Sequence, residues 1–126
     1  MELAVRVLVG LIGLPLLALG LKSMFRPVSM LDDLALDPRG AAGLNTVRGV
    51  IGGLFLACVA MIGLGLLQSQ TLWFVAVALL MGLAALGRVV GIALDGFDRA
   101  VVRPIVAELV IAAVLVGAHL GLGELG

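Results

Sequence analysis

Four long apolar runs constrain the fold of this chain more than any other feature of its sequence. They cover residues 3–21, 44–67, 71–94 and 104–122. Each run is close to the ~20 residues that a helix needs to cross the ~30 Å hydrocarbon layer of a bilayer. Within that layer only a helix satisfies the backbone polar groups of its own segment. The sequence therefore predicts an all-α protein, a bundle of four transmembrane helices in antiparallel up-down order.

Composition supports a membrane protein of one domain. Hydrophobic residues make up 63% of the 126 residues and charged residues 13%, against about 25% charged residues in soluble domains. A chain this short could not hide so much apolar surface from water, so we expect residues 1–126 to form a single integral membrane domain. The first run exceeds the usual 7–15 apolar residues of a secretory signal, which favours a retained span.

The connections between the runs carry recognisable helix signals. Residues 29–32, Ser-x-x-Asp, precede two leucines and predict a short interfacial helix in the first loop. Asp37-Pro38 predicts the start of the second long helix, with Asp as N-cap and Pro at the first helical position. Gly96 is placed to end the third helix and Pro104 to open the fourth.

The basic residues predict the orientation of the chain. Only Arg6 lies at the end that carries the termini, and the other seven basic residues lie at or near the first and third connections. They are Lys22, Arg26, Arg39, Arg48, Arg88, Arg99 and Arg103. By the positive-inside rule the long loops are cytoplasmic and both termini are outside. We expect a multi-pass protein of the cell inner (plasma) membrane, and the zero net charge gives no case for nucleic-acid binding.

A set of polar residues at one depth of the spans is the strongest candidate for a functional site. The set is Asn45, Arg48, Arg88, Asp95 and Glu108. An ionisable side chain at the centre of a span costs at least ~2.5–3.5 kcal/mol, so we expect these groups to point inward and pair. The pairs are Arg48–Glu108 with Arg88–Asp95, or the crossed arrangement. The network then either clamps the helices in register or forms a polar pocket for a headgroup, an ion or a proton.

Glycines four residues apart predict close helix packing on three of the spans. These helix-packing glycines are Gly49, Gly53, Gly87, Gly91, Gly117 and Gly121. Small residues at this spacing let two membrane helices approach closely. We expect this packing within the monomer, with self-association as the alternative.

The remaining chemistry-bearing residues predict no catalytic or metal site. Cys58 is the sole cysteine and is expected to be a small apolar packing residue. His119 has no second ligand at metal-binding spacing. We therefore expect no metal, no cofactor and no catalytic residue.

Two segments resemble a known family. Residues 43–56, GLNTVRGVIGGLFL, and residues 87–96, GRVVGIALDG, are similar to the second-helix and third-helix signatures of domain-of-unknown-function family 4345, small bacterial membrane proteins. The resemblance implies a four-helix membrane protein and supplies no established activity. It also implies that the five polar residues of the predicted network are characteristic positions of the family.

Three functions follow as hypotheses. The first is a non-enzymatic structural or accessory component, in contact with the lipid bilayer and with other membrane subunits or a second copy of itself. The alternative is a small transporter or a lipid- or ion-binding protein that uses the polar network as its site. The third, an enzyme acting on lipids with Asp95 or Glu108 as base, lacks an accompanying nucleophile or metal site.

Overall fold

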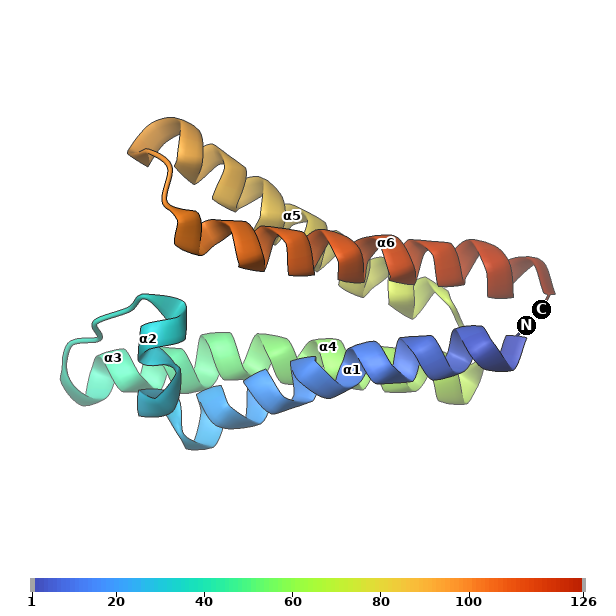
Figure 1. The fold of residues 1–126 in the computed structure, drawn as a ribbon. Coiled ribbons are helices and arrows are strands. Elements are labelled where there is room, and N and C mark those ends of the chain that lie inside the picture. The colour runs from blue at the N-terminus through green and yellow to red at the C-terminus, as the bar shows by residue number, and fades with distance from the viewer. Residues whose placement is uncertain (1, 126) are drawn as a thin grey trace. The chain divides into compact units, whose positions relative to one another are not determined.

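The computed structural model describes residues 2–125 as an almost wholly helical chain, and side chains are described for residues 2–122. About 90% of the chain is helical, and no strand occurs within residues 2–125. Four helices are long and apolar enough to cross a membrane: Glu2–Phe25, Gly40–Gln68, Leu72–Asp95 and Arg99–Leu122. Each helix overlaps one of the four predicted runs, with ends that differ by up to five residues. The all-α, four-span fold class is therefore confirmed (Figure 1).

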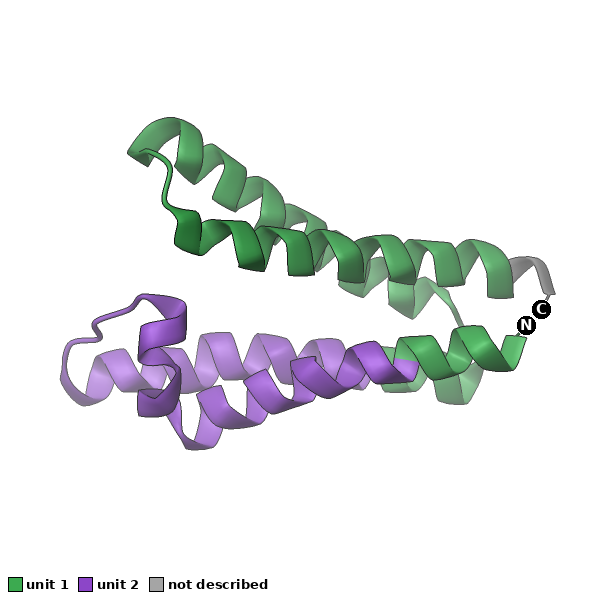
Figure 2. Ribbon diagram, viewed as in Figure 1, with its two compact units in different colours: residues 1–9, 61–126 green, residues 10–60 purple. Residues whose placement is uncertain are grey.

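The chain divides into two compact units. Unit 1 contains residues 1–9 and 61–126, and unit 2 contains residues 10–60 (Figure 2). The division falls within two long helices, since α1 (Glu2–Phe25) and α4 (Gly53–Gln68) each contribute to both units.

Unit 2 joins the greater part of α1 to the greater part of the second span. That span runs without a break from α3 (Gly40–Thr46) through a π-helical segment, η2 (Val47–Gly52), into α4. The two helices approach closely at Gly52, where an added Cβ would lie 2.9 Å from the backbone nitrogen of Met24. A side chain at this position has no room, because the obstacle is main chain. Gly52 therefore sets how closely α1 and the second span pack.

The first loop contains the predicted short helix. It forms as η1 (Pro27–Met30) followed by α2 (Leu31–Leu34), and Pro27 and Met30 are buried. Ser29 lies within η1 and does not cap α2, since its hydroxyl donates to the carbonyl of Arg26 at 2.6 Å. Local hydrogen bonding of serine to its own turn competes with helix capping.

The predicted start of the second long helix, with Asp37 as N-cap and Pro38 as the first helical residue, is wrong by two residues. The helix begins at Gly40, after an extended Arg39 at the N-cap position. Gly40 has a φ of +57°, a left-handed conformation that residues other than glycine rarely adopt. A right-handed helix cannot continue through this residue, so Asp37 and Pro38 remain outside it.

Unit 1 is built on an antiparallel pair of long helices, α5 (Leu72–Asp95) and α6 (Val102–Leu125). Gly96, with a φ of +102°, ends α5 as predicted. The loop then forms η3 (Arg99–Val101), where the Asp98 carboxylate accepts from the Ala100 amide at 2.9 Å. The fourth span opens before Pro104, since α6 begins at Val102; proline is tolerated there because the first amides of a helix lack helical partners.

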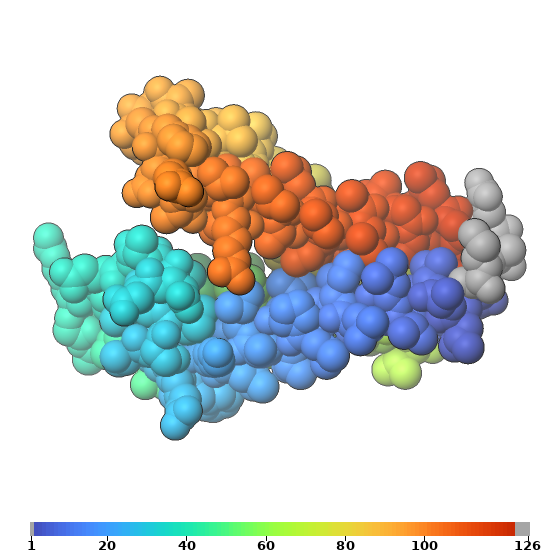
Figure 3. All heavy atoms as spheres, in the orientation of Figure 1, coloured from blue at the N-terminus to red at the C-terminus, as the bar shows by residue number. Residues whose placement is uncertain are grey.

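The turn from α4 to α5 is as short as predicted and occupies residues 69–71. It brings the end of α4 against the start of α5, where an added Cβ at Gly65 would lie 2.5 Å from the ring of Phe74. Phe74, Val77 and Leu115 are fully buried and form part of the core. Much of α6 is nevertheless uncovered, as the orange and red atoms of Figure 3 show, and its exposed side chains include Val106, Leu109, Val110 and Leu120.

The six predicted helix-packing glycines stay a prediction, because none of them lies at a close contact with another described helix. At Gly49, Gly53, Gly87, Gly117 and Gly121 an added Cβ would meet no atom within 4 Å among the described residues, and at Gly91 only Asp95 of the same helix, at 4.0 Å. The close approaches occur at Gly20, Gly52 and Gly65 instead. Spacing places two glycines on one face of a helix, but it does not determine which face meets a neighbour.

Candidate functional site

Arg88 and Glu108 form an ion pair between α5 and α6. The Arg88 Nε donates to both carboxylate oxygens of Glu108, at 2.9 Å to Oε1 and 3.2 Å to Oε2. Arg88 lies seven residues before the end of α5 and Glu108 six residues after the start of α6. At 1.5 Å per residue both lie roughly 10 Å inside their helix ends. This pair belongs to the crossed arrangement that the sequence allowed.

The pair is unevenly buried. The Glu108 side chain is 14% exposed and the Arg88 side chain 39% exposed. Only the Nε of Arg88 is engaged, and its two terminal nitrogens donate to no described residue. A guanidinium carries five N–H groups. Arg88 therefore keeps donors for a further acceptor, such as a phosphate or a polar group of another protein.

The other three residues of the predicted network are not drawn into this ion pair. Asn45 and Asp95 are exposed, and neither side chain hydrogen-bonds within the described part of the chain. Arg48 belongs to unit 2 and donates from Nη1 to the carbonyl oxygen of Met24 at 2.7 Å. Met24 lies in the last turn of α1, whose carbonyls lack helical partners and carry the negative end of the helix dipole. The five-residue network therefore stays a prediction, of which Arg88–Glu108 is the part that forms.

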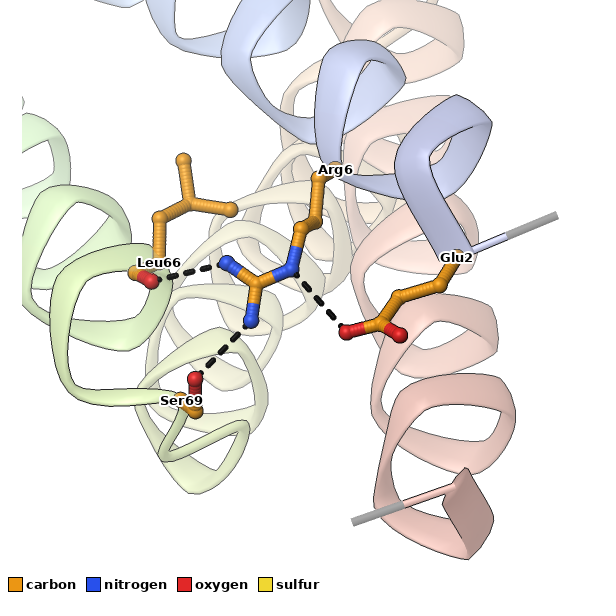
Figure 4. Close-up of polar contacts among 4 residues, drawn as sticks. All are labelled: Glu2, Arg6, Leu66 and Ser69. Atoms are coloured by element: carbon orange, nitrogen blue, oxygen red, sulfur yellow. Dashed lines mark hydrogen bonds and ion pairs between the residues drawn. The ribbon is translucent and has the colours of Figure 1, made fainter.

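A second polar cluster, which the sequence analysis did not predict, lies at the end of unit 1 that holds the α4–α5 turn. We call this the hairpin end. Arg6 donates to the carbonyl oxygen of Leu66 at 2.9 Å, to Ser69 Oγ at 2.9 Å and to Glu2 Oε1 at 3.4 Å (Figure 4). Leu66 is in the last turn of α4, so Arg6 caps a helix C-terminus as Arg48 does. One sign of this cluster is present in the sequence, because Arg6 lies apart from the other seven basic residues.

A small cavity adjoins Arg6. Its volume is about 120 Å³ and it is lined by Glu2, Arg6, Gly65, Leu66, Ser69, Thr71, Phe74 and Leu122. Nearby, Thr71 Oγ1 lies 2.8 Å from His119 Nδ1, a hydrogen bond that joins the start of α5 to α6. The cavity thus has one cation, one carboxylate and two hydroxyls beside an apolar wall.

Cys58 and His119 contribute no metal ligands to these clusters. Cys58 is buried and unpaired, and the Nδ1 of His119 is engaged by Thr71. Within the described residues there is no group of three or more His, Cys, Asp or Glu side chains that could hold a metal ion.

Comparison with known proteins identifies one relationship. A family model described as a domain of unknown function, DUF4345, matches residues 4–119. This match covers nearly the whole chain and both segments on which the resemblance was based. No curated protein and no solved structure matches the chain.

Proposed function

The chain belongs to the DUF4345 family, and we propose that it acts as a non-catalytic accessory component of a larger membrane assembly. The observation that carries this proposal is that most residues in the apolar part of every span are not buried inside the protein. Between 17% and 22% of the apolar window of each span is buried. Contiguous exposed apolar surface on a membrane protein faces either lipid or another protein.

The Arg88 guanidinium supports contact with a protein partner. It lies roughly 10 Å inside the helix end, where free N–H groups are costly in a lipid environment. Its Nε is held by Glu108, which fixes the direction of the remaining donors. A carboxylate, an amide or a backbone carbonyl of a neighbouring helix would complete its hydrogen bonding.

The proposal is tested on protein purified in mild detergent. We expect the parent chain to elute as a complex of defined stoichiometry, either with itself or with another membrane protein. Arg88→Gln should release the partner, whereas the control Arg99→Gln, at an exposed position of η3, should retain it. A parent chain that is monomeric at all concentrations and carries no second chain would contradict the proposal.

One observation favours a second function, a small transporter or a lipid- or ion-binding protein. Glu108 is a largely buried carboxylate whose described hydrogen-bond partner is a single arginine, and membrane carboxylates of this kind commonly serve ion or proton movement. Transport requires that Glu108→Gln abolish flux into proteoliposomes while the protein remains folded. Equal flux in mutant and parent would remove this function.

A further inference from the structure

We propose that the cavity at the hairpin end of unit 1 binds the headgroup of a phosphatidylethanolamine-type lipid. Arg6 would hold the phosphate and Glu2 the primary ammonium. This site is separate from Arg88–Glu108 and does not depend on the accessory role proposed above.

The charges of the cavity match a zwitterion. Among the described residues, its charged lining consists of one cation, Arg6, and one anion, Glu2, joined by a long contact of 3.4 Å. The Glu2 carboxylate would repel a purely anionic headgroup, and the Arg6 guanidinium would repel a purely cationic one. A zwitterion can exchange this weak ion pair for two charge-assisted hydrogen bonds, which are among the strong ones in proteins.

Both charged residues are available to a ligand. Three hydrogen bonds from Arg6 are described, and a guanidinium has five N–H groups. The Glu2 side chain is 55% exposed. The contacts with Leu66 and Ser69 hold the guanidinium in place (Figure 4), so it is oriented before a ligand arrives.

The depth of Arg6 suits a lipid headgroup. The 24 residues of α1 extend about 36 Å, some 3 Å beyond each side of a ~30 Å hydrocarbon layer. Arg6 is the fifth residue of this helix, roughly 6 Å from its first residue. Its backbone therefore lies near the hydrocarbon boundary, and a long side chain there reaches the phosphate level.

The size and lining of the cavity favour a small headgroup with a primary ammonium. A volume of about 120 Å³ is well below the ~300 Å³ of cavities that enclose drug-sized molecules. The Leu66 carbonyl and the Ser69 hydroxyl each accept one hydrogen bond from Arg6 and keep a second lone pair for a further N–H donor. A quaternary ammonium is recognised by a cage of aromatic rings, whereas Phe74 is the single aromatic residue among the described residues that line this cavity.

Native mass spectrometry of the purified full chain in detergent tests the proposal. Phosphatidylethanolamine, phosphatidylcholine and phosphatidylglycerol with identical acyl chains are titrated separately. We expect phosphatidylethanolamine to bind about tenfold more tightly than phosphatidylcholine, since one charge-assisted hydrogen bond is worth about that factor. Arg6→Gln should weaken the binding of phosphatidylethanolamine and phosphatidylcholine alike, because both carry the phosphate that Arg6 would hold, and Lys22→Gln, at the other end of α1, should leave both affinities unchanged.

A second variant keeps the test decisive if Arg6→Gln weakens the fold. Glu2→Gln loses one long, exposed contact and should fold normally, yet it leaves the cavity with a net positive charge. It should therefore reverse the order of affinity, so that phosphatidylglycerol binds more tightly than phosphatidylethanolamine. Equal binding of all three lipids to the parent, or an unchanged order in Glu2→Gln, would overturn the proposal. Displacement of the lipid by an equal concentration of soluble O-phosphoethanolamine would overturn its assignment as a lipid site.

Discussion

At the scale of single residues, three arginines in the spans find three kinds of hydrogen-bonded partner. Arg88 pairs with a carboxylate, Arg48 with a helix carbonyl, and Arg6 with a carbonyl, a hydroxyl and a distant carboxylate. The carbonyls lie in the last turns of α1 and α4, where they have no helical donor. Arg48 and Arg6 thus bind the carbonyls of helix C-termini. Pairing each cation with an acidic side chain would not have predicted these contacts.

The coupling between Arg88 and Glu108 is open to direct measurement. Removing one partner of a buried ion pair costs about 3–5 kcal/mol, and of an exposed pair about 0–1 kcal/mol. Because Arg88 is partly exposed, we expect Arg88→Gln and Glu108→Gln each to lower the free energy of unfolding by ~1–3 kcal/mol. The double mutant should lose less than the sum, as measured by unfolding in mixed detergent micelles. Strict additivity of the two losses would show that the pair contributes nothing.

At the scale of elements, glycine matters where two helices meet closely. Gly52 faces the backbone of Met24, whereas Gly53, the next residue, has no atom within 4 Å of an added Cβ. Gly53 belongs to a predicted pair of packing glycines and Gly52 does not, yet it is Gly52 that lies against the other helix. The spacing of glycines in the sequence therefore did not identify the packed position. The close contact between Gly52 and Met24 therefore depends on how the second span is rotated about its own axis, because the rotation decides which residue faces α1.

These two glycines form a matched pair of variants. Gly52→Ala should destabilise the protein by ~1–3 kcal/mol, the usual cost of forcing an extra group into a packed contact. Gly53→Ala should cost nothing or stabilise slightly, since alanine is the better helix former. Thermal unfolding in one detergent, followed by circular dichroism, compares them. An equal loss in both variants would contradict the packing at Gly52.

At the scale of the whole molecule, the charges predict how the chain crosses the membrane. Seven of the eight basic residues lie at or near the two long connections. Four helices are long and apolar enough to cross a membrane, and four successive spans would alternate in direction. The hairpin end, with Arg6 as its sole basic residue, would then face outward. The lipid site proposed above would draw its ligand from the outer leaflet.

Cysteine labelling in intact cells checks this orientation. In a Cys58→Ala background, a cysteine introduced at Gln70 should react with a membrane-impermeant maleimide, and one at Asp33 or Asp98 should react only after lysis. All three positions are exposed, so accessibility depends on the side of the membrane. Labelling of Asp98→Cys in intact cells without labelling of Gln70→Cys would reverse the assignment.

Sequence alone determined the four spans, the short turn between the second and third, the end of α5 at Gly96 and the family. Each depends on local properties: the length of an apolar run, the conformational freedom of one glycine, or a motif. It also identified Arg88 and Glu108 as ionisable side chains that need partners, because an unpaired charge inside a membrane span is energetically costly.

The tertiary structure decided which partners and which glycines are used. Arg88 meets Glu108, Arg48 meets the Met24 carbonyl, and Gly52 rather than Gly53 lies against another helix. The physical reason is that every span is apolar on nearly all sides, so its pattern does not define the inward face. That face is set by the packing of one helix against another, which no single run of sequence contains.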